Sequence, residues 1–409
     1  MRILFLSHYF PPEVNAPATR TYEHCMHWVK MGHHVTVISC VPNHPMGKLY
    51  PGYKNRFYQR HNVDGIEVIR LLTYVTPNTG FLKRTCNYFL YMLMTILVAP
   101  FTAKADIVIS TSPQFFNGLA GYFVSRIKRI PWCLEIRDLW PESITAVGAI
   151  NNTTIIKFLQ SLESFVYRKA DHVVAVTYSF ERHIVSKGAD SSAISVIPNG
   201  VNFDLFDQQQ RKNHQADIAQ SLGLQDKFVA SYVGTHGMAH GLDVILDAAE
   251  LCREATDLAF LMVGDGAEKQ RLLDEKNRRG LTNVIMLEQQ DKSKMPDIWS
   301  LSDVSLVLLK KQDLFLTVLP SKMFESMAMK KPIILGVQGE AQALIEQAQA
   351  GICITPENAH ELLAAIRQLQ ADHINYQEYA QAGYHYVKAH FDRAALASQY
   401  ERVLRSLVS

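Results

Sequence analysis

Short apolar runs alternate with longer helix-like stretches along the first half of this chain of 409 residues. Each run has the length of a buried strand, and the runs lie at residues 3–7, 35–39, 66–71, 107–111, 132–136 and 173–177. Parallel strands need a crossover connection, which is usually a helix, so this alternation is typical of parallel sheets. The sequence therefore predicts an α/β fold.

The same alternation starts again after residue 200, with runs at residues 229–233, 258–263, 283–287, 304–309 and 332–335. A chain of this length exceeds what one hydrophobic core usually serves. We therefore expect two Rossmann-like, doubly wound domains at residues 1–197 and 198–385, with a C-terminal helix at 386–409 packing back on the first domain. In such folds ligands bind at the carboxyl ends of the strands, here facing a central cleft.

Charge and cysteine content exclude several classes of function. The formal net charge is +2, which is too small for general nucleic-acid binding. The six cysteines lack the close C-x-x-C spacing of zinc or redox sites, and no clustered Asp or His pattern indicates a metal centre. The apolar run at the N-terminus is too short for a secretory signal, which predicts a cytoplasmic protein.

Residues 317–336 carry the densest group of candidate binding side chains. A helix that starts near Pro320 would place Ser321, Lys322 and Glu325 on its first turns. The helix N-terminus and Lys322 can hold phosphates, and Glu325 can accept hydrogen bonds from ribose hydroxyls, which suits a nucleotide diphosphate. The alternative is an ordinary helix whose charges face water. Both interpretations hold in part, because a site helix also needs a core face.

The most apolar segment of the chain lies at residues 83–104, with basic residues at both ends. Its uninterrupted core, residues 88–101, is shorter than the roughly 20 residues of a membrane-spanning helix, and Pro100 interrupts its end. Two interpretations remain open. The segment is an interfacial helix with Lys83 and Arg84 at the level of the lipid headgroups, or a helix buried against the first sheet. Both hold if the inner face packs and the outer face contacts lipid.

Three motifs resemble those of family 4 retaining glycosyltransferases of the GT-B fold. They are the opening segment at residues 7–13, the hinge Pro198-Asn199-Gly200-Val201, and residues 320–325 followed by Lys331-Pro332. The resemblance covers nearly the whole chain. It implies that the second domain binds a nucleotide sugar, that the first binds the acceptor, and that no metal or other cofactor is needed.

Two further segments resemble one branch of this family. Residues 15–20 and 137–143 are similar to those of WbuB-like proteins of bacterial O-antigen and capsule synthesis, for which N-acetyl-L-fucosaminyl transfer is the usual assignment. We expect a UDP-sugar as the donor. Because the apolar residues 88–101 and their basic flank lie in the domain that receives the acceptor in this fold, we expect a lipid-linked acceptor, such as a saccharide on undecaprenyl diphosphate, and a protein that is peripheral on the inner face of the bacterial plasma membrane. A soluble acceptor is the alternative, and it would make residues 88–101 ordinary core.

The chain departs from the common family pattern at the phosphate end of the second domain. Many members place an arginine and a lysine in the loop after its first strand, whereas the loop Gly234–Gly241 has Thr235 and His240 at these positions. Of the family's paired glutamates, only the second has a counterpart, Glu325. Lys322 is therefore expected to supply the main positive charge for the leaving diphosphate, assisted by backbone amides of the loop and by His240 if it is protonated.

Arg137 and Asp138 follow the run at residues 132–136, so both emerge at a strand's carboxyl end. Asp138 is a candidate to orient the acceptor hydroxyl or to remove its proton, and Glu142, one turn later, can do the same. The alternative is an Arg-Asp pair that only pins the loop.

Three other residues are candidate substrate contacts. Arg20, at the start of the first helix, can reach phosphates, although an exposed helix charge is the alternative. His8 follows the first strand and can face the acceptor, but a histidine there is more often structural. Asn199 is included because it lies in the hinge motif.

Two other functions share this fold. A nucleotide-sugar 2-epimerase would turn over the donor without any acceptor. A catalytically silent sugar-nucleotide binder or scaffold is conceivable because the arginine, the lysine and the first glutamate of the family are missing. Lys322 and Glu325 argue against the silent protein.

Overall fold

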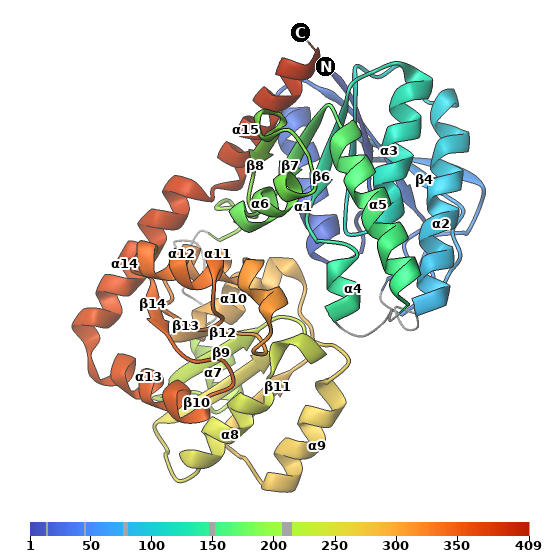
Figure 1. Cartoon of the computed structure of the whole chain (residues 1–409). Helices are drawn as coiled ribbons and strands as arrows, with labels where there is room; N and C mark the ends of the chain where they lie inside the picture. The colour runs from blue at the N-terminus through green and yellow to red at the C-terminus, as the bar shows by residue number, and fades with distance from the viewer. Residues whose placement is uncertain (14, 45, 77–80, 147–151, 207–214, 409) are drawn as a thin grey trace. The chain divides into compact units, whose positions relative to one another are not determined.

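The computed structural model of the chain describes residues 1–13, 15–44, 46–76, 81–146, 152–206 and 215–408 (Figure 1). They form two compact units: unit 1 comprises Met1–Asn199 and Arg393–Ser409, and unit 2 comprises Gly200–Asp392. The division falls two residues later than the expected boundary at 197/198. Arg20 of unit 1 donates hydrogen bonds to the carbonyls of Ile197 (2.7 Å) and Pro198 (2.6 Å), which ties these residues to unit 1.

Unit 1 is built on an eight-stranded sheet with the strand order β3-β4-β2-β1-β5-β6-β7-β8. All neighbours are parallel except β3 and β4. The strands are β1 (Arg2–Leu6), β2 (His34–Cys40), β3 (Tyr58–Val63), β4 (Ile66–Leu71), β5 (Ile107–Thr111), β6 (Trp132–Ile136), β7 (His172–Ala175) and β8 (Ile194–Val196). Two of them, β3 and β8, were not expected from the sequence. Strand β3 is a largely exposed, polar edge strand, and β8 is only three residues long, so neither has an apolar run.

Helices cover both faces of this sheet. One core cluster joins the sheet to α2, α3, α5 and α6, and another joins the opposite strand faces to α1 and α15. The helices are α1 (Ala16–Lys30), α2 (Phe81–Val98), η1 (Ala99–Phe101), α3 (Phe115–Lys128), α4 (Glu142–Ala146), α5 (Thr153–Lys169), α6 (Tyr178–Ser186), η2 (Ser191–Ala193) and α15 (Arg393–Val408). Trp28 of α1 donates a hydrogen bond to the Ala397 carbonyl of α15 (3.0 Å). The terminal helix therefore packs on unit 1, but it begins at Arg393 rather than at residue 386.

Unit 2 has a six-stranded parallel sheet with the order β11-β10-β9-β12-β13-β14. Its strands are β9 (Phe228–Val233), β10 (Leu258–Val263), β11 (Val284–Leu287), β12 (Val304–Leu308), β13 (Ile333–Gly336) and β14 (Gly351–Cys353). The three-residue β14 was not expected. Its helices are α7 (Gln215–Ser221), η4 (Met238–His240), α8 (Asp243–Leu251), α9 (Lys269–Arg279), η5 (Lys292–Lys294), α10 (Met295–Ser300), η6 (Asp313–Thr317), α11 (Lys322–Ala328), α12 (Glu340–Ala348), α13 (Ala359–Ala371) and α14 (His373–His390).

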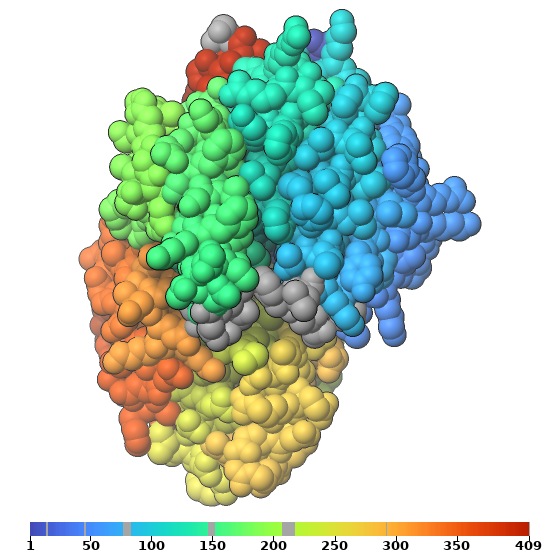
Figure 2. All heavy atoms as spheres, turned by 45° about the vertical axis from the view of Figure 1, so that its right-hand side comes forward, coloured from blue at the N-terminus to red at the C-terminus, as the bar shows by residue number. Residues whose placement is uncertain are grey.

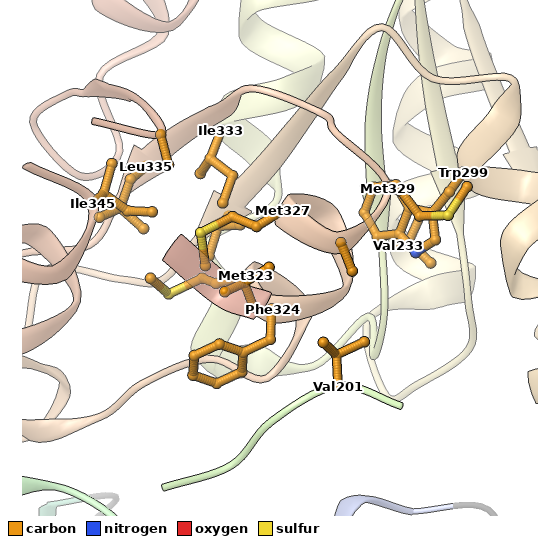
Figure 3. Packing of buried hydrophobic residues seen from close by; sticks show 14 of the residues in the cluster. Val201, Val233, Trp299, Met323, Phe324, Met327, Met329, Ile333, Leu335 and Ile345 are labelled. Atoms are coloured by element: carbon orange, nitrogen blue, oxygen red, sulfur yellow. The ribbon is translucent and has the colours of Figure 1, made fainter. Parts of the chain in front are cut away.

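Helix α11 is fixed in place by its apolar face. Met323, Phe324 and Met327 lie in one buried cluster with Ile333 and Leu335 of β13 (Figure 3). The opposite side of α11 carries Lys322 and Glu325, which are only partly buried. The core face and the polar face expected for this helix are therefore both present, and the core face holds the polar one in position.

Candidate functional site

A lysine with a buried ammonium group lies at the carboxyl end of β9 in unit 2. The Lys322 Nζ atom is 3.7 Å from the centre of the Tyr232 ring. It is buried, and it has no hydrogen-bond partner among the described residues. A Cβ atom added to Gly234 would come within 3.1 Å of Nζ, so the glycine leaves room for the ammonium group. A cation–π contact alone is a weak partner for a buried ammonium.

Two histidines surround the same tyrosine. The centre of the His236 ring lies 5.8 Å from that of Tyr232, and the centre of the His240 ring lies 6.0 Å from it. His236 is fully buried, and neither of its ring nitrogens has a hydrogen-bond partner in the described part of the chain. The Nδ1 atom of His240 is also buried and unpaired there. Buried polar atoms are normally hydrogen-bonded, so this basic cluster has the properties of a site that an anion completes.

Burial weakens the charge of all three groups. It lowers the pKa of Lys322 to about 7, and the Glu325 carboxylate on the same helix partly opposes this effect. Burial, followed by the charges of Lys269 and Lys322, lowers the pKa of His236 to about 4. Burial and Lys322 lower the pKa of His240 to about 3, although a hydrogen bond to the Leu308 backbone opposes the shift. In the free site His240 is therefore neutral at pH 7, which favours a neutral hydrogen-bonding group over the cation considered from the sequence.

The loop that carries the histidines is held by glycines. An added Cβ at Gly264 would lie 1.9 Å from the Gly234 carbonyl oxygen, and one at Gly266 would lie 2.5 Å from that of His236. The Thr235 carbonyl accepts a hydrogen bond from the Tyr232 hydroxyl (2.7 Å). The backbone of Gly264 and Gly266 thus packs closely against the loop that carries His236. His236 was not predicted as a site residue. Its position between two glycine turns at strand ends was the available signal.

The remaining predicted residues of unit 2 lie at the edges of this cluster. Gly241 has φ +58°, a left-handed conformation that favours glycine. Helix α11 begins at Lys322 and has seven residues, and the exposed Ser321 side chain forms no capping hydrogen bond. The helix thus starts two residues after Pro320. Glu325 is close enough to raise the pKa of Lys322.

A small pocket in unit 1 contains Asp138. Its walls include Ser112, Phe115 and Trp140. The rings of Phe115 and Trp140 are stacked, with their centres 6.4 Å apart. The Asp138 carboxylate accepts a hydrogen bond from the Ser143 hydroxyl (3.3 Å). Burial raises the pKa of Asp138 to about 6, although the Ser143 hydrogen bond opposes the shift. A carboxyl group with a raised pKa between aromatic walls is suited to accept a proton near neutral pH.

Gln114 also lines this pocket and was not predicted. Its Nε2 atom is buried and has no hydrogen-bond partner among the described residues. It follows β5 as Asp138 follows β6, and these strands are parallel neighbours. The carboxyl ends of parallel neighbours share one sheet edge, so the sequence contained the signal for this residue.

Glu142 is engaged elsewhere. Its carboxylate lies 3.0 Å from the Lys187 ammonium and 3.7 Å from His183, and Lys187 is also 3.0 Å from Glu163. Glu142, Glu163 and His183 are close enough to share a metal ion, but the lysine already supplies the cation. The predicted role of Glu142 as an alternative to Asp138 is therefore not supported by its contacts.

The two arginines of unit 1 that were predicted as site residues instead connect segments of this unit. Arg20 bonds to Glu135 (3.0 Å) and to the carbonyls of Ile197 and Pro198, and the Asn199 side chain is 3.4 Å from its Nη1 atom. These partners occupy Arg20 and also explain the position of Asn199. Arg20 is therefore neither free for a phosphate nor exposed.

Arg137 donates hydrogen bonds to the carbonyls of Ala16 (3.1 Å) and Pro17 (3.2 Å). These bonds tie the loop after β6 to the start of α1. Asp138 bonds instead to Ser143, so the loop is not pinned by an Arg137–Asp138 pair. Arg137 therefore shapes the loop that carries Asp138.

His8 is buried in a second, polar pocket of unit 1. Its Nε2 atom is 3.4 Å from the Asn87 side-chain oxygen, and His44 and Arg84 also line the pocket. Burial lowers the pKa of His8 to about 3, so the ring is neutral. Its contacts with three tyrosine rings support the structural alternative.

Helix α2 has one buried and one exposed apolar face. Tyr91 is fully buried, and its hydroxyl donates a hydrogen bond to the Ile38 carbonyl (2.8 Å). The outer face exposes Phe89, Leu93 and Leu97, one turn apart, and Phe101 of η1 is 89% exposed. Within the described residues, no helix is both long and apolar enough to cross a membrane. The segment is therefore partly core and partly an apolar surface.

Comparison with known proteins identifies relatives of both units. The Escherichia coli (strain K12) protein WcaI, whose name describes a glycosyl transferase of colanic acid biosynthesis, is 25% identical over 386 residues, which cover 90% of this chain and 92% of that protein. Sucrose-phosphate synthase from Thermosynechococcus elongatus is similar in structure, with a TM-score of 0.78 and 18% identity over 99% of this chain and 98% of that one. Anabaena HepE in complex with UDP-glucose has a TM-score of 0.70 and 18% identity over the full length of both chains.

These neighbours confirm the GT-B fold expected from the sequence. Two family models also match, and together they span most of the chain. The chain therefore contains a glycosyl transferase 4-like domain at residues 15–200 and a domain of glycosyl transferases group 1 at residues 214–386.

Proposed function

We propose that this protein is a retaining hexosyltransferase of bacterial surface polysaccharide synthesis, which moves a sugar from a UDP-sugar to a lipid-linked acceptor. The observation that carries the proposal is the buried, unpaired basic cluster of unit 2. Lys322, His236 and His240 offer donors to one anion, and a diphosphate provides many acceptor oxygens. The similarity to HepE, which was solved with UDP-glucose, supports UDP as the nucleotide.

Glu325 is proposed to contact the ribose. It lies one turn after Lys322 on α11, whose core face is locked against β13. A carboxylate there can accept hydrogen bonds from the ribose hydroxyls while Lys322 contacts the phosphates. The charge of Lys322 and the backbone amides near Gly234 would then stabilise the diphosphate as it leaves.

Asp138 is proposed to act on the acceptor. In the transfer step the acceptor oxygen forms a bond to the anomeric carbon, and the bond from that carbon to the diphosphate oxygen breaks. The proton of the acceptor hydroxyl passes to Asp138 or to the departing diphosphate. The raised pKa of Asp138 and the stacked rings of Phe115 and Trp140 make its pocket suitable for a sugar hydroxyl.

A lipid-linked acceptor is proposed because of the apolar surface of unit 1. Phe89, Leu93 and Leu97 of α2 are exposed, as are Phe123 and Ile127 of α3. Both helices form part of the outer surface of unit 1 in Figure 2. Several basic residues lie near the ends of these two helices or just after them: Lys83, Arg84, Lys104, Arg126, Lys128 and Arg129. Exposed apolar residues together with basic residues suit the anionic inner face of a bacterial membrane.

The transferred sugar is proposed to be N-acetyl-L-fucosamine or a related deoxy or amino sugar. This part of the proposal rests on the resemblance of residues 15–20 and 137–143 to WbuB-like proteins. The acceptor is proposed to be a saccharide on undecaprenyl diphosphate. The colanic acid assignment in the name of WcaI supports a role in surface polysaccharide synthesis in general.

The test is a transfer assay with purified protein, a panel of UDP-sugars and undecaprenyl-diphosphate-linked saccharides. The expected result is release of UDP together with a lipid product that is heavier by one sugar, with its α or β configuration unchanged from the donor. Conversion of a UDP-sugar without acceptor would identify an epimerase instead. Binding of UDP-sugars with no product from any acceptor would identify a silent binder.

A further inference from the structure

We propose that the basic cluster of unit 2 is a proton-linked anion site, in which Lys322 gains its proton as the diphosphate enters and His236 and His240 act as neutral hydrogen-bond donors. The inference rests on the proposed donor site and adds a regulation by pH. It concerns Lys322, His236, His240 and Tyr232, which all lie within unit 2.

The geometry around Lys322 does not favour a charged amine without a ligand. Nζ lies 3.7 Å from the centre of the Tyr232 ring and close to Gly234, where an added Cβ atom would come within 3.1 Å of it. No described residue accepts a hydrogen bond from it. An ammonium group removed from water without an acceptor loses much of its solvation free energy, so the neutral amine is favoured. A diphosphate beside Nζ would supply both the acceptors and the opposite charge.

The groups around the cluster do not replace that ligand. The charged or titratable groups that face it are Tyr232 of β9, Asp265 after β10, Lys269 of α9, Glu325 of α11, and Lys310 and Glu357 beside Gly241. Glu325 attracts the ammonium, but Nζ forms no hydrogen bond with it. Lys269 is held by the carbonyls of Gly264 (3.0 Å) and Leu287 (2.6 Å), and its charge makes protonation of His236 less favourable.

The histidines fit the role of neutral donors. Both ring nitrogens of His236 and Nδ1 of His240 are buried and unpaired in the described structure. A neutral imidazole has one N–H group, which can donate to a phosphate oxygen without the cost of a buried charge. The two rings therefore offer hydrogen bonds without adding a buried charge, and Lys322 is left as the titrating group.

The direction in which pH changes the anion affinity follows from the protonation state of Lys322 in the free site. Below pH 7 the Lys322 side chain is already protonated in most molecules, so binding of the anion takes up few protons from the solution. Above pH 7 the free amine is mostly neutral, and each bound anion must draw a proton from the solvent. Affinity should therefore fall as pH rises above 7, by about tenfold per pH unit once the free amine is fully neutral.

The experiment is calorimetric titration of the full-length protein with UDP at pH 8, in buffers of different ionisation enthalpy. The terminal phosphate of UDP, with a pKa of about 6, does not titrate there. The expected uptake is close to one proton per UDP bound. Lys322→Arg is the matched control, because arginine keeps its charge at every pH used, and its uptake should fall to nearly zero. His236→Gln and His240→Gln should weaken binding but leave the uptake unchanged.

Binding of UDP without proton uptake by the wild-type protein would overturn the inference and leave the proposed donor site intact. Uptake that persists in Lys322→Arg would overturn the assignment to Lys322. If Lys322→Arg does not fold, the pH dependence of UDP affinity in the wild type decides the matter, and a flat profile between pH 7 and 9 rejects the linkage. Absence of UDP binding at pH 7 would reject both this inference and the proposed function.

Discussion

At the scale of single residues, the site consists of groups that the fold alone leaves unsatisfied. Lys322 Nζ and the ring nitrogens of His236 are buried without hydrogen-bond partners in the described chain. Such groups cost stability, and proteins retain them mainly where function requires them. Lys322 was predictable because Pro320 and the apolar spacing of α11 fixed its place. His236 was not predicted, because its burial depends on the packing of Gly264 and Gly266 against the loop.

Replacing Lys322 with methionine should stabilise the free protein and weaken UDP binding. Methionine fills similar space and removes the cost of a buried amine beside Tyr232. Because folding lowers the pKa of Lys322 to about 7, the unfolded chain binds more protons above that pH, and the Lys322 contribution makes wild-type stability rise with pH there. Thermal unfolding at several pH values should show a higher Tm for the variant at pH 7 and a smaller pH dependence. A lower Tm would contradict this account.

Asp138→Asn should lower transfer while leaving UDP binding intact. A general base contributes about 10²–10⁴-fold to a rate. Because Asp138 must be deprotonated to act and its pKa is about 6, wild-type transfer should rise between pH 5 and 7. The variant should lose that rise, as measured by initial rates at saturating donor. Glu142→Gln is the comparison, because its carboxylate is paired with Lys187. An equal loss of rate in both variants, or a retained rise in Asp138→Asn, would contradict the role.

At the scale of elements, α2 shows what a sequence pattern leaves open. Residues 88–101 are apolar on nearly every side, so the sequence alone could not separate core from surface. Packing against the sheet determines which face of α2 is buried. Tyr91 bonds to Ile38 of β2, whereas Leu93 and Leu97 are exposed. The parallel strands were predictable because each is a compact apolar run. The polar edge strand β3 and the three-residue strands β8 and β14 had no such signal.

The double variant Leu93→Glu/Leu97→Glu should detach the protein from anionic lipid vesicles without unfolding it. Each exposed leucine that enters the interface contributes about 1–3 kcal/mol, so vesicle affinity should fall at least about tenfold. Co-sedimentation with vesicles and circular dichroism measure the two effects. Leu251→Glu on the exposed surface of unit 2 is a matched control. Substitution of the buried Tyr91 would instead unfold the helix, so it cannot serve as the test. Undiminished vesicle binding by the double variant would count against the membrane surface.

At the scale of the whole molecule, each unit has its own core, and α15 completes unit 1. Tyr400 of α15 is fully buried, and its ring centre lies 5.3 Å from that of Trp28. The two α/β units were predictable from the restart of the strand pattern. The end of the second unit was placed too early, because the sequence does not show that α14 runs to His390 and stays with unit 2.

Tyr400→Ala should destabilise unit 1 and spare UDP binding. Removing a buried aromatic side chain costs about 3–5 kcal/mol. Differential scanning calorimetry should show an earlier transition for unit 1, while UDP should still raise the transition of unit 2. Ser398→Ala, at a half-buried position of the same helix, removes only one hydroxyl group and should leave both transitions nearly unchanged. Loss of UDP stabilisation in Tyr400→Ala would show that the donor site depends on unit 1.

Calorimetry with UDP and uridine measures directly whether the cluster around Lys322 binds a diphosphate. Wild-type protein should bind UDP far more tightly than uridine, and this preference should collapse in Lys322→Met. Lys330→Met, which removes another lysine over a tyrosine ring (4.8 Å from the centre of Tyr384), should keep the preference. Equal affinity of the wild type for UDP and uridine, or a full preference in Lys322→Met, would contradict the account.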